Sequence, residues 1–123
     1  MRIIISNSSE KPIYEQITDQ IKTLILKEDI LEGEPLPSIR NLASQLKISV
    51  ITTKRAYEEL EKEGFIETIK GKGSFVAPQN KELLLEKKMQ IVESHLIKAI
   101  DEAKTIDLSL NQIKELLDIL YNE

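Results

Sequence analysis

Residues 34–76 contain an ordered series of local signals that limits the fold more than any other part of the chain. Two helical patterns, separated by a short polar turn, are followed by two β-rich segments at 65–69 and 74–76. The sequence Lys-Gly-Lys-Gly at 70–73 lies between these segments and is typical of a hairpin turn. This order predicts a winged helix-turn-helix, a module that places one helix in the major groove of DNA and a hairpin beside it.

Three helices are expected before the hairpin. The first has Pro12 in its opening turn and ends near Asp29, ahead of a breaker cluster at 33–35. Ser38 and Ser49 are suitable N-caps for the second and third helices, and Gly64 is expected to end the third. The residues expected to face the core are Ile13, Ile17, Ile21, Leu24, Ile25, Ile39, Leu42, Ala43, Leu46, Thr53, Ala56, Tyr57 and Leu60.

The chain beyond Pro78 has the pattern of two more helices. One covers 80–104, and the other begins at a capping box formed by Ser109 and Gln112. Their apolar stripes are too long for one small winged domain to cover, whereas self-pairing of two tails would bury them. The expected homodimer interface is Leu84, Ile91, Val92, Leu96, Ile100, Ile113, Leu116, Leu117 and Leu120. We therefore expect a mainly α fold with a small β-hairpin, divided into a DNA-binding domain at 1–77 and a two-helix dimerisation tail at 78–123.

Composition narrows the function class. The chain has no cysteine, a single histidine (His95), no clustered metal ligands and no phosphate-binding loop, so we expect neither an enzyme nor a bound cofactor or metal. It has no apolar run near the roughly 18 residues that a membrane span needs, and its N-terminal apolar run is too short for a signal peptide. A soluble, cytoplasmic protein is expected.

The net charge of −4 is unfavourable for a nucleic-acid binder, but the charge is unevenly distributed. Between Ser38 and Arg55 there are four basic residues and no acidic one. Lys70 and Lys72 add positive charge at the hairpin tip. Phosphate contacts are local, so one positive surface can bind a polyanion even on an acidic protein.

At LPSIRNLA (36–43) and AYEELEKEGFIETIKGKGSFV (56–76) the sequence resembles the GntR family of bacterial transcription regulators. Segments 12–17, 36–43, 55–66 and 71–76 match the family's motifs in register, so the resemblance covers about residues 10–77. The tail at 77–123 is short, which is similar to the YtrA-type subfamily. The resemblance implies a sequence-specific regulator, expected to be a repressor that reads an inverted repeat as a homodimer. A winged helix that binds protein instead of DNA is the alternative, and whether a small effector binds is left open.

Candidate DNA-contacting residues lie at the two helix starts and at the hairpin tip. Arg40 lies beside Ser38, and in the family the matching arginine contacts DNA. Hydroxyl and ammonium groups at the start of the third helix suit phosphates and base edges. Arg55 suits either a phosphate or an ion pair with Glu58 or Glu59. The full set is Ser38, Arg40, Ser49, Val50, Ile51, Thr52, Lys54, Arg55, Gly71, Lys72 and Gly73.

Val50 and Ile51 depart from the usual pattern of short-tailed family members, which have polar residues or proline at these positions. Two readings are open for these β-branched side chains. They could contact thymine methyl groups and so favour A·T pairs. Alternatively, one of them could pack into the core and shift the helix.

Overall fold

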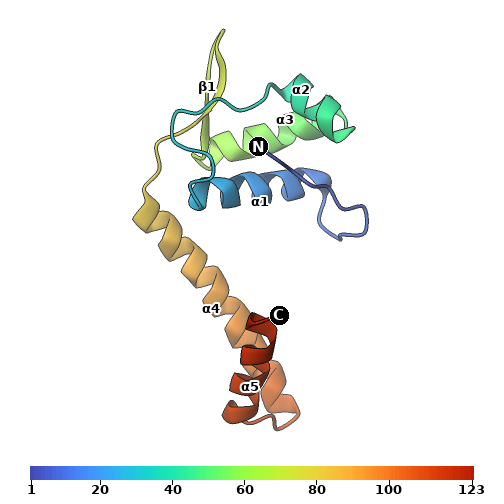
Figure 1. Ribbon diagram of the computed structural model, residues 1–123, viewed down its shortest axis with the longest axis vertical. Helices are drawn as coiled ribbons and strands as arrows, with labels where there is room; N and C mark the ends of the chain where they lie inside the picture. The colour runs from blue at the N-terminus through green and yellow to red at the C-terminus, as the bar shows by residue number, and fades with distance from the viewer. The chain divides into compact units, whose positions relative to one another are not determined.

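The computed structural model describes residues 1–123 and divides them into two compact units, Met1–Lys81 and Glu82–Glu123 (Figure 1). The first unit contains three helices and a two-stranded hairpin, and the second is helical throughout. The elements in chain order are α1 (Ile13–Leu26), α2 (Ile39–Leu46), α3 (Val50–Lys62), β1 (Ile66–Ile69), β2 (Gly73–Val76), α4 (Lys81–Thr105) and α5 (Leu110–Tyr121).

The core of the first unit forms where α3 packs against both α1 and α2. The four α3 positions expected to face inward, Thr53, Ala56, Tyr57 and Leu60, are all buried. They recur at the three- and four-residue spacing that keeps side chains on one face of a helix. The hairpin contributes Ile66 and Val76 to the same core. This packing confirms the inward face that the sequence predicts for the third helix.

Most helix ends follow local sequence signals. The Ser38 and Ser49 hydroxyls accept hydrogen bonds from the N–H groups of Asn41 and Thr52, as N-caps do. Gly64 ends α3 with a φ of 81°, a left-handed conformation that suits glycine. Lys47 occupies the equivalent position after α2 with a φ of 57°. Because Lys47 carries a Cβ, this helix end holds backbone strain that the end of α3 does not.

The hairpin has a third, strand-like partner. β1 and β2 pair in antiparallel register, with Ile66 opposite Val76. On the other side of β2, the N–H of Gly33 donates to the Val76 carbonyl at 2.8 Å, and the N–H of Leu36 donates to the Ser74 carbonyl at 2.9 Å. Pro35 lies between these two donors, at a position where an edge strand needs no N–H from it. The segment expected to act only as a breaker therefore also extends the sheet.

Two glutamines on α1 hold the N-terminal arm. The Gln20 side chain accepts from the Ile4 N–H at 2.9 Å and donates to the Ile4 carbonyl at 2.7 Å. Gln16, one turn earlier, makes the same pair of bonds with the backbone of Ser6, at 2.8 and 3.0 Å. The two amides thus satisfy backbone groups that a neighbouring strand would otherwise satisfy.

The second unit has almost no core of its own. The predicted capping box is present, because the Ser109 side chain caps Gln112 and the Gln112 side chain caps Ser109. Ala103 is the unit's one buried residue, and the apolar residues along α4 and α5 are largely exposed. They include Leu85 and Met89, which continue the stripe of Val92 and were not predicted to be part of it. None of the helices in the chain combines the length and apolar character that crossing a bilayer requires.

Replacing Lys47 with glycine is predicted to stabilise the first unit. A non-glycine residue in the left-handed region costs roughly 1–2 kcal/mol, and glycine removes this cost. The greater freedom of glycine in the unfolded chain offsets about 0.4–1 kcal/mol of that stabilisation. We therefore expect Lys47→Gly to raise the free energy of unfolding in urea by about 0.5–1 kcal/mol. Gly64→Ala is the matched control and should lower it by a similar amount. Equal stability in both variants would contradict this account of the helix ends.

Candidate nucleic-acid interface

The first turn of α3 presents polar groups that are already held in place. The Ser49 hydroxyl accepts from the Thr52 N–H at 3.0 Å and lies 2.8 Å from the Thr52 hydroxyl oxygen, to which it donates. Thr53 is fully buried, and its hydroxyl donates back to the Ser49 carbonyl. Ser49 therefore serves as the predicted cap, while the Thr52 hydroxyl keeps a hydrogen that it can donate to a ligand.

Val50 and Ile51 do not enter the core. Their exposed fractions are 50% and 81%. Ile51 precedes the buried Thr53 by two residues, which at 3.6 residues per turn is about 200° around the helix. The side chain of Ile51 therefore lies on the face of α3 opposite the core. The structure thus argues against the reading in which one of these side chains packs into the core, and contact with thymine methyl groups stays a prediction.

Lys54 and Arg55 each interact with another side chain, but in different ways. The Lys54 ammonium lies 3.8 Å from a Glu58 carboxylate oxygen, one helical turn away, and both side chains are exposed. Exposed pairs of this kind are weak, so a phosphate could replace Glu58. The Arg55 guanidinium stacks on the Tyr14 ring of α1, 3.8 Å from its centroid. No pattern in the sequence indicates this cation–π contact, which leaves the edge of the guanidinium available for hydrogen bonds.

Arg40 is exposed in the first turn of α2 and has no hydrogen-bond or ion-pair partner. Ser38 caps the N–H of Asn41, whereas the N–H of Arg40 itself belongs to the unpaired first turn. A side-chain cation beside free N–H groups at a helix start is suited to an anion such as phosphate. The predicted contact of Arg40 with DNA stays a prediction.

Tyr57 connects this helix start to α3. Its hydroxyl donates to the Pro37 carbonyl at 2.6 Å, just before the cap of α2. Burial raises the pKa of the Tyr57 hydroxyl, so the group stays protonated and remains a donor. One core residue of α3 thereby fixes the backbone that leads into Ser38 and Arg40. Neither the hydrogen bond nor its target could be identified from sequence spacing.

The hairpin tip is a tight, cationic turn. The Lys72 N–H donates to the Ile69 carbonyl at 2.9 Å, and Gly71 within the turn has a φ of 79°. Lys70 and Lys72 are exposed without ion-pair partners, and Gly73 begins β2. Figure 1 shows the hairpin projecting away from α1, with α2 on that same side of α1. From Pro35 to Tyr57, the segment that includes α2 and the start of α3 contains no acidic residue.

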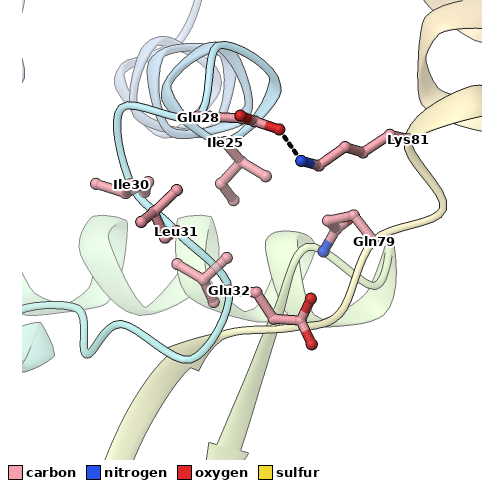
Figure 2. A pocket seen from close by; sticks show the side chains of 8 residues that line it. Ile25, Glu28, Ile30, Leu31, Glu32, Gln79 and Lys81 are labelled. Atoms are coloured by element: carbon pink, nitrogen blue, oxygen red, sulfur yellow. Dashed lines mark ion pairs between the residues drawn. The ribbon is translucent and has the colours of Figure 1, made fainter.

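A small hollow lies where the hairpin runs into the linker (Figure 2). Apolar side chains including Ile25 and Leu31 line it, and an ion pair between Glu28 and Lys81 lies at its rim. The Gln79 amide donates to the Ala77 carbonyl at 2.8 Å and to the Gly64 carbonyl at 3.0 Å. The volume is about 200 Å³, smaller than the usual pockets of roughly 300–1,000 Å³ for small ligands. No group of three or more His, Cys, Asp or Glu side chains in the chain is placed to hold a metal ion.

Comparison with known sequences identifies a protein family and a similar repressor. The family described as "Bacterial regulatory proteins, gntR family" matches residues 13–76. The HTH-type transcriptional repressor YtrA of Bacillus subtilis is 39% identical over 113 residues, which are 92% of this chain and 87% of that protein. This alignment reaches beyond the winged domain into the two-helix tail.

Solved structures with the same fold extend the comparison. A crystal structure described as a transcriptional antiterminator from Listeria monocytogenes EGD-e superposes with a TM-score of 0.75 and 35% identity, covering 100% of this chain and 91% of that one. The DNA-binding domain of AraR in complex with operator ORX1 superposes with a TM-score of 0.55 and 25% identity. That match covers 63% of this chain and 96% of the AraR domain.

Replacing Tyr57 with phenylalanine is predicted to destabilise the first unit by about 1–2 kcal/mol, because the Pro37 carbonyl loses its donor. The difference in stability between the wild type and Tyr57→Phe should also depend on pH. Tyrosine in the unfolded chain ionises near its ordinary pKa of 10.0, whereas burial raises the pKa of Tyr57 above that value in the folded chain. The contribution of Tyr57 to the free energy of unfolding is therefore complete below pH 10 and is lost as the pH rises beyond that value.

Urea unfolding at pH 8 and at pH 10.5 tests both effects. The stability difference between the wild type and Tyr57→Phe should shrink at the higher pH. A difference that is absent at pH 8, or that grows with pH, would contradict the role given to Tyr57.

Proposed function

Because the chain belongs to the gntR family of bacterial regulatory proteins and is a DNA-binding transcription regulator rather than an enzyme, we propose that it is a repressor that binds an inverted-repeat operator as a homodimer. The observation that carries this proposal is the acid-free segment that includes the exposed starts of α2 and α3. A protein of this kind would act in the bacterial cytoplasm, where the chromosome lies.

In the proposed complex the first turns of α3 enter the major groove. Val50, Ile51 and Thr52 would face base edges, since they lie at the end of the helix that reaches the groove in helix-turn-helix proteins. Lys54 would exchange its exposed partner Glu58 for a phosphate or a guanine. Arg55 would bind phosphate through its free edge while Tyr14 holds its plane.

The start of α2 and the hairpin tip would fix the register on the duplex. Arg40 would bind a phosphate together with the N–H groups of its own helix start, and Ser38 supports that turn as its cap. Gly71, Lys72 and Gly73 would approach the backbone or the minor groove beside the recognition helix. Such contacts set affinity and orientation, whereas α3 sets sequence preference.

Dimerisation would use the exposed apolar faces of α4 and α5. Ala103 is the one buried residue of the second unit, so the unit gains its core only by packing on another surface. A second copy of the same tail supplies a self-complementary surface and generates two-fold symmetry. The two recognition helices would then read half-sites separated by about 10 bp or a multiple of it. The similarity to the repressor YtrA, which extends into the tail, supports the proposed role as a repressor.

Replacing Arg40 with alanine is predicted to weaken operator binding about tenfold with little change in stability. Arg40 is exposed and unpaired, so its removal costs the fold little, whereas a charge-assisted contact with phosphate is lost. Mobility shifts with a selected operator at two salt concentrations measure the effect, and the salt dependence of the variant should be shallower. Normal binding by Arg40→Ala would count against the proposed face. Binding only to proteins, with no DNA selected, would instead favour the alternative protein-interaction role.

Replacing Leu96 with glutamate is predicted to raise the dissociation constant of the homodimer by at least about tenfold, because a charge would be buried in the interface. Leu117→Glu in α5 should act in the same way. Ile4→Glu is the matched control, since Ile4 is an exposed aliphatic residue of the first unit. Sedimentation across a range of protein concentrations gives the dissociation constants. A Leu96→Glu protein that dimerises like the wild type would show that the tail does not form the interface.

A further inference from the structure

Ile51 is the most exposed large apolar side chain of the first unit, at 81%. Single exposed apolar residues are common and need no explanation by themselves. The position of Ile51 is what distinguishes it, because it lies in the first turn of the helix proposed to enter the groove. No contact within the fold accounts for an isoleucine there.

The neighbours of Ile51 on the helix surface are cationic. Residues three and four positions apart share a helix face, so Ile51 is flanked by Lys54 and Arg55. The acidic residues of α3 begin only with Glu58, one further turn along. An apolar group bordered by two cations fits a ligand that has apolar atoms in the middle and negative charges at its edges.

The major groove of DNA offers one apolar group of this kind. Among the four bases, thymine alone carries a methyl group, at C5, and this methyl lies in the major groove between the two phosphate backbones. A β-branched side chain with restricted χ1 presents its methyl groups without much loss of rotamer freedom. Isoleucine thus combines an apolar surface with a fixed direction.

We propose that Ile51 is a specificity-determining residue that reads the C5 methyl group of a thymine in each operator half-site. This inference rests on the proposed DNA-binding function and specifies which chemical group of the base is recognised. Val50 is also exposed, at 50%, but it lies nearer the core face of α3 than Ile51, so its side chain reaches less far from the helix toward the bases. Thr52 and Lys54 remain available for hydrogen bonds to neighbouring base edges.

A deoxyuridine substitution tests the proposal directly, because deoxyuridine pairs like thymidine but lacks the methyl group. The wild-type protein is used first to select an operator from a random DNA pool. Dissociation constants are then measured for duplexes in which each symmetric pair of thymidines is replaced by deoxyuridine. At one pair we expect binding to weaken by roughly tenfold, from about three- to fourfold for each methyl group lost.

The Ile51 variants assign the effect to this side chain. Ile51→Ser should bind the thymidine and deoxyuridine duplexes with nearly equal affinity, whereas Ile51→Val, which keeps two methyl groups, should retain most of the discrimination. Ile4→Ser is the matched control, because Ile4 is an exposed isoleucine of the N-terminal arm. It should behave like the wild type. Circular dichroism of each variant checks that the fold is intact.

The outcomes separate this inference from the function on which it rests. If no operator is selected, the DNA-binding proposal fails and this inference fails with it. If an operator is bound but every deoxyuridine duplex binds equally well, or Ile51→Ser keeps the discrimination, this inference alone is wrong. Because 5-methylcytosine carries the same methyl group, a duplex with methylated cytosines is a further arm. Tighter binding there, with no effect of deoxyuridine, would overturn the assignment to thymine.

Discussion

The packing of α3 against α1 and α2 is the constraint on which the rest of the first unit depends. Thr53, Ala56 and Tyr57 face inward, so the opposite face of the helix must face solvent. The same packing places the Tyr57 hydroxyl against the Pro37 carbonyl, which fixes the start of α2. The buried face of α3 therefore determines which of its side chains are available to a ligand. It also determines the position of the first turn of α2, which carries Arg40.

The two units use apolar residues for different purposes. The first unit buries them and is stabilised by its own core, whereas the second exposes them along α4 and α5. A helical pair with so little internal packing is marginal by itself, because most helix stability in proteins comes from burial of an apolar face. In the proposed homodimer, one association step buries the apolar faces of the two tails and also brings two DNA-binding domains into two-fold symmetry. Affinity for an inverted repeat would then depend on protein concentration.

The sequence was sufficient for features that depend on local chemistry. The caps Ser38 and Ser49, the end of α3 at Gly64 and the capping box at Ser109 were all predicted, because each depends on residues a few positions apart. The family motifs gave the order of the elements. Contacts between distant segments were missed, including the stacking of Arg55 on Tyr14, the glutamine clamp on the N-terminal arm and the pairing of 33–36 with β2. The type and spacing of residues do not specify which distant partner they meet.

The central claim is that the starts of α2 and α3 and the hairpin tip act together as one DNA-binding surface. Amide chemical shifts of the full-length protein, recorded during titration with its selected operator duplex, test this claim most directly. The account predicts that the largest changes fall together at 38–41, 49–55 and 70–73. It would be contradicted if the changes spared any one of these three segments, or if they were largest in the N-terminal arm or along the exposed face of α1.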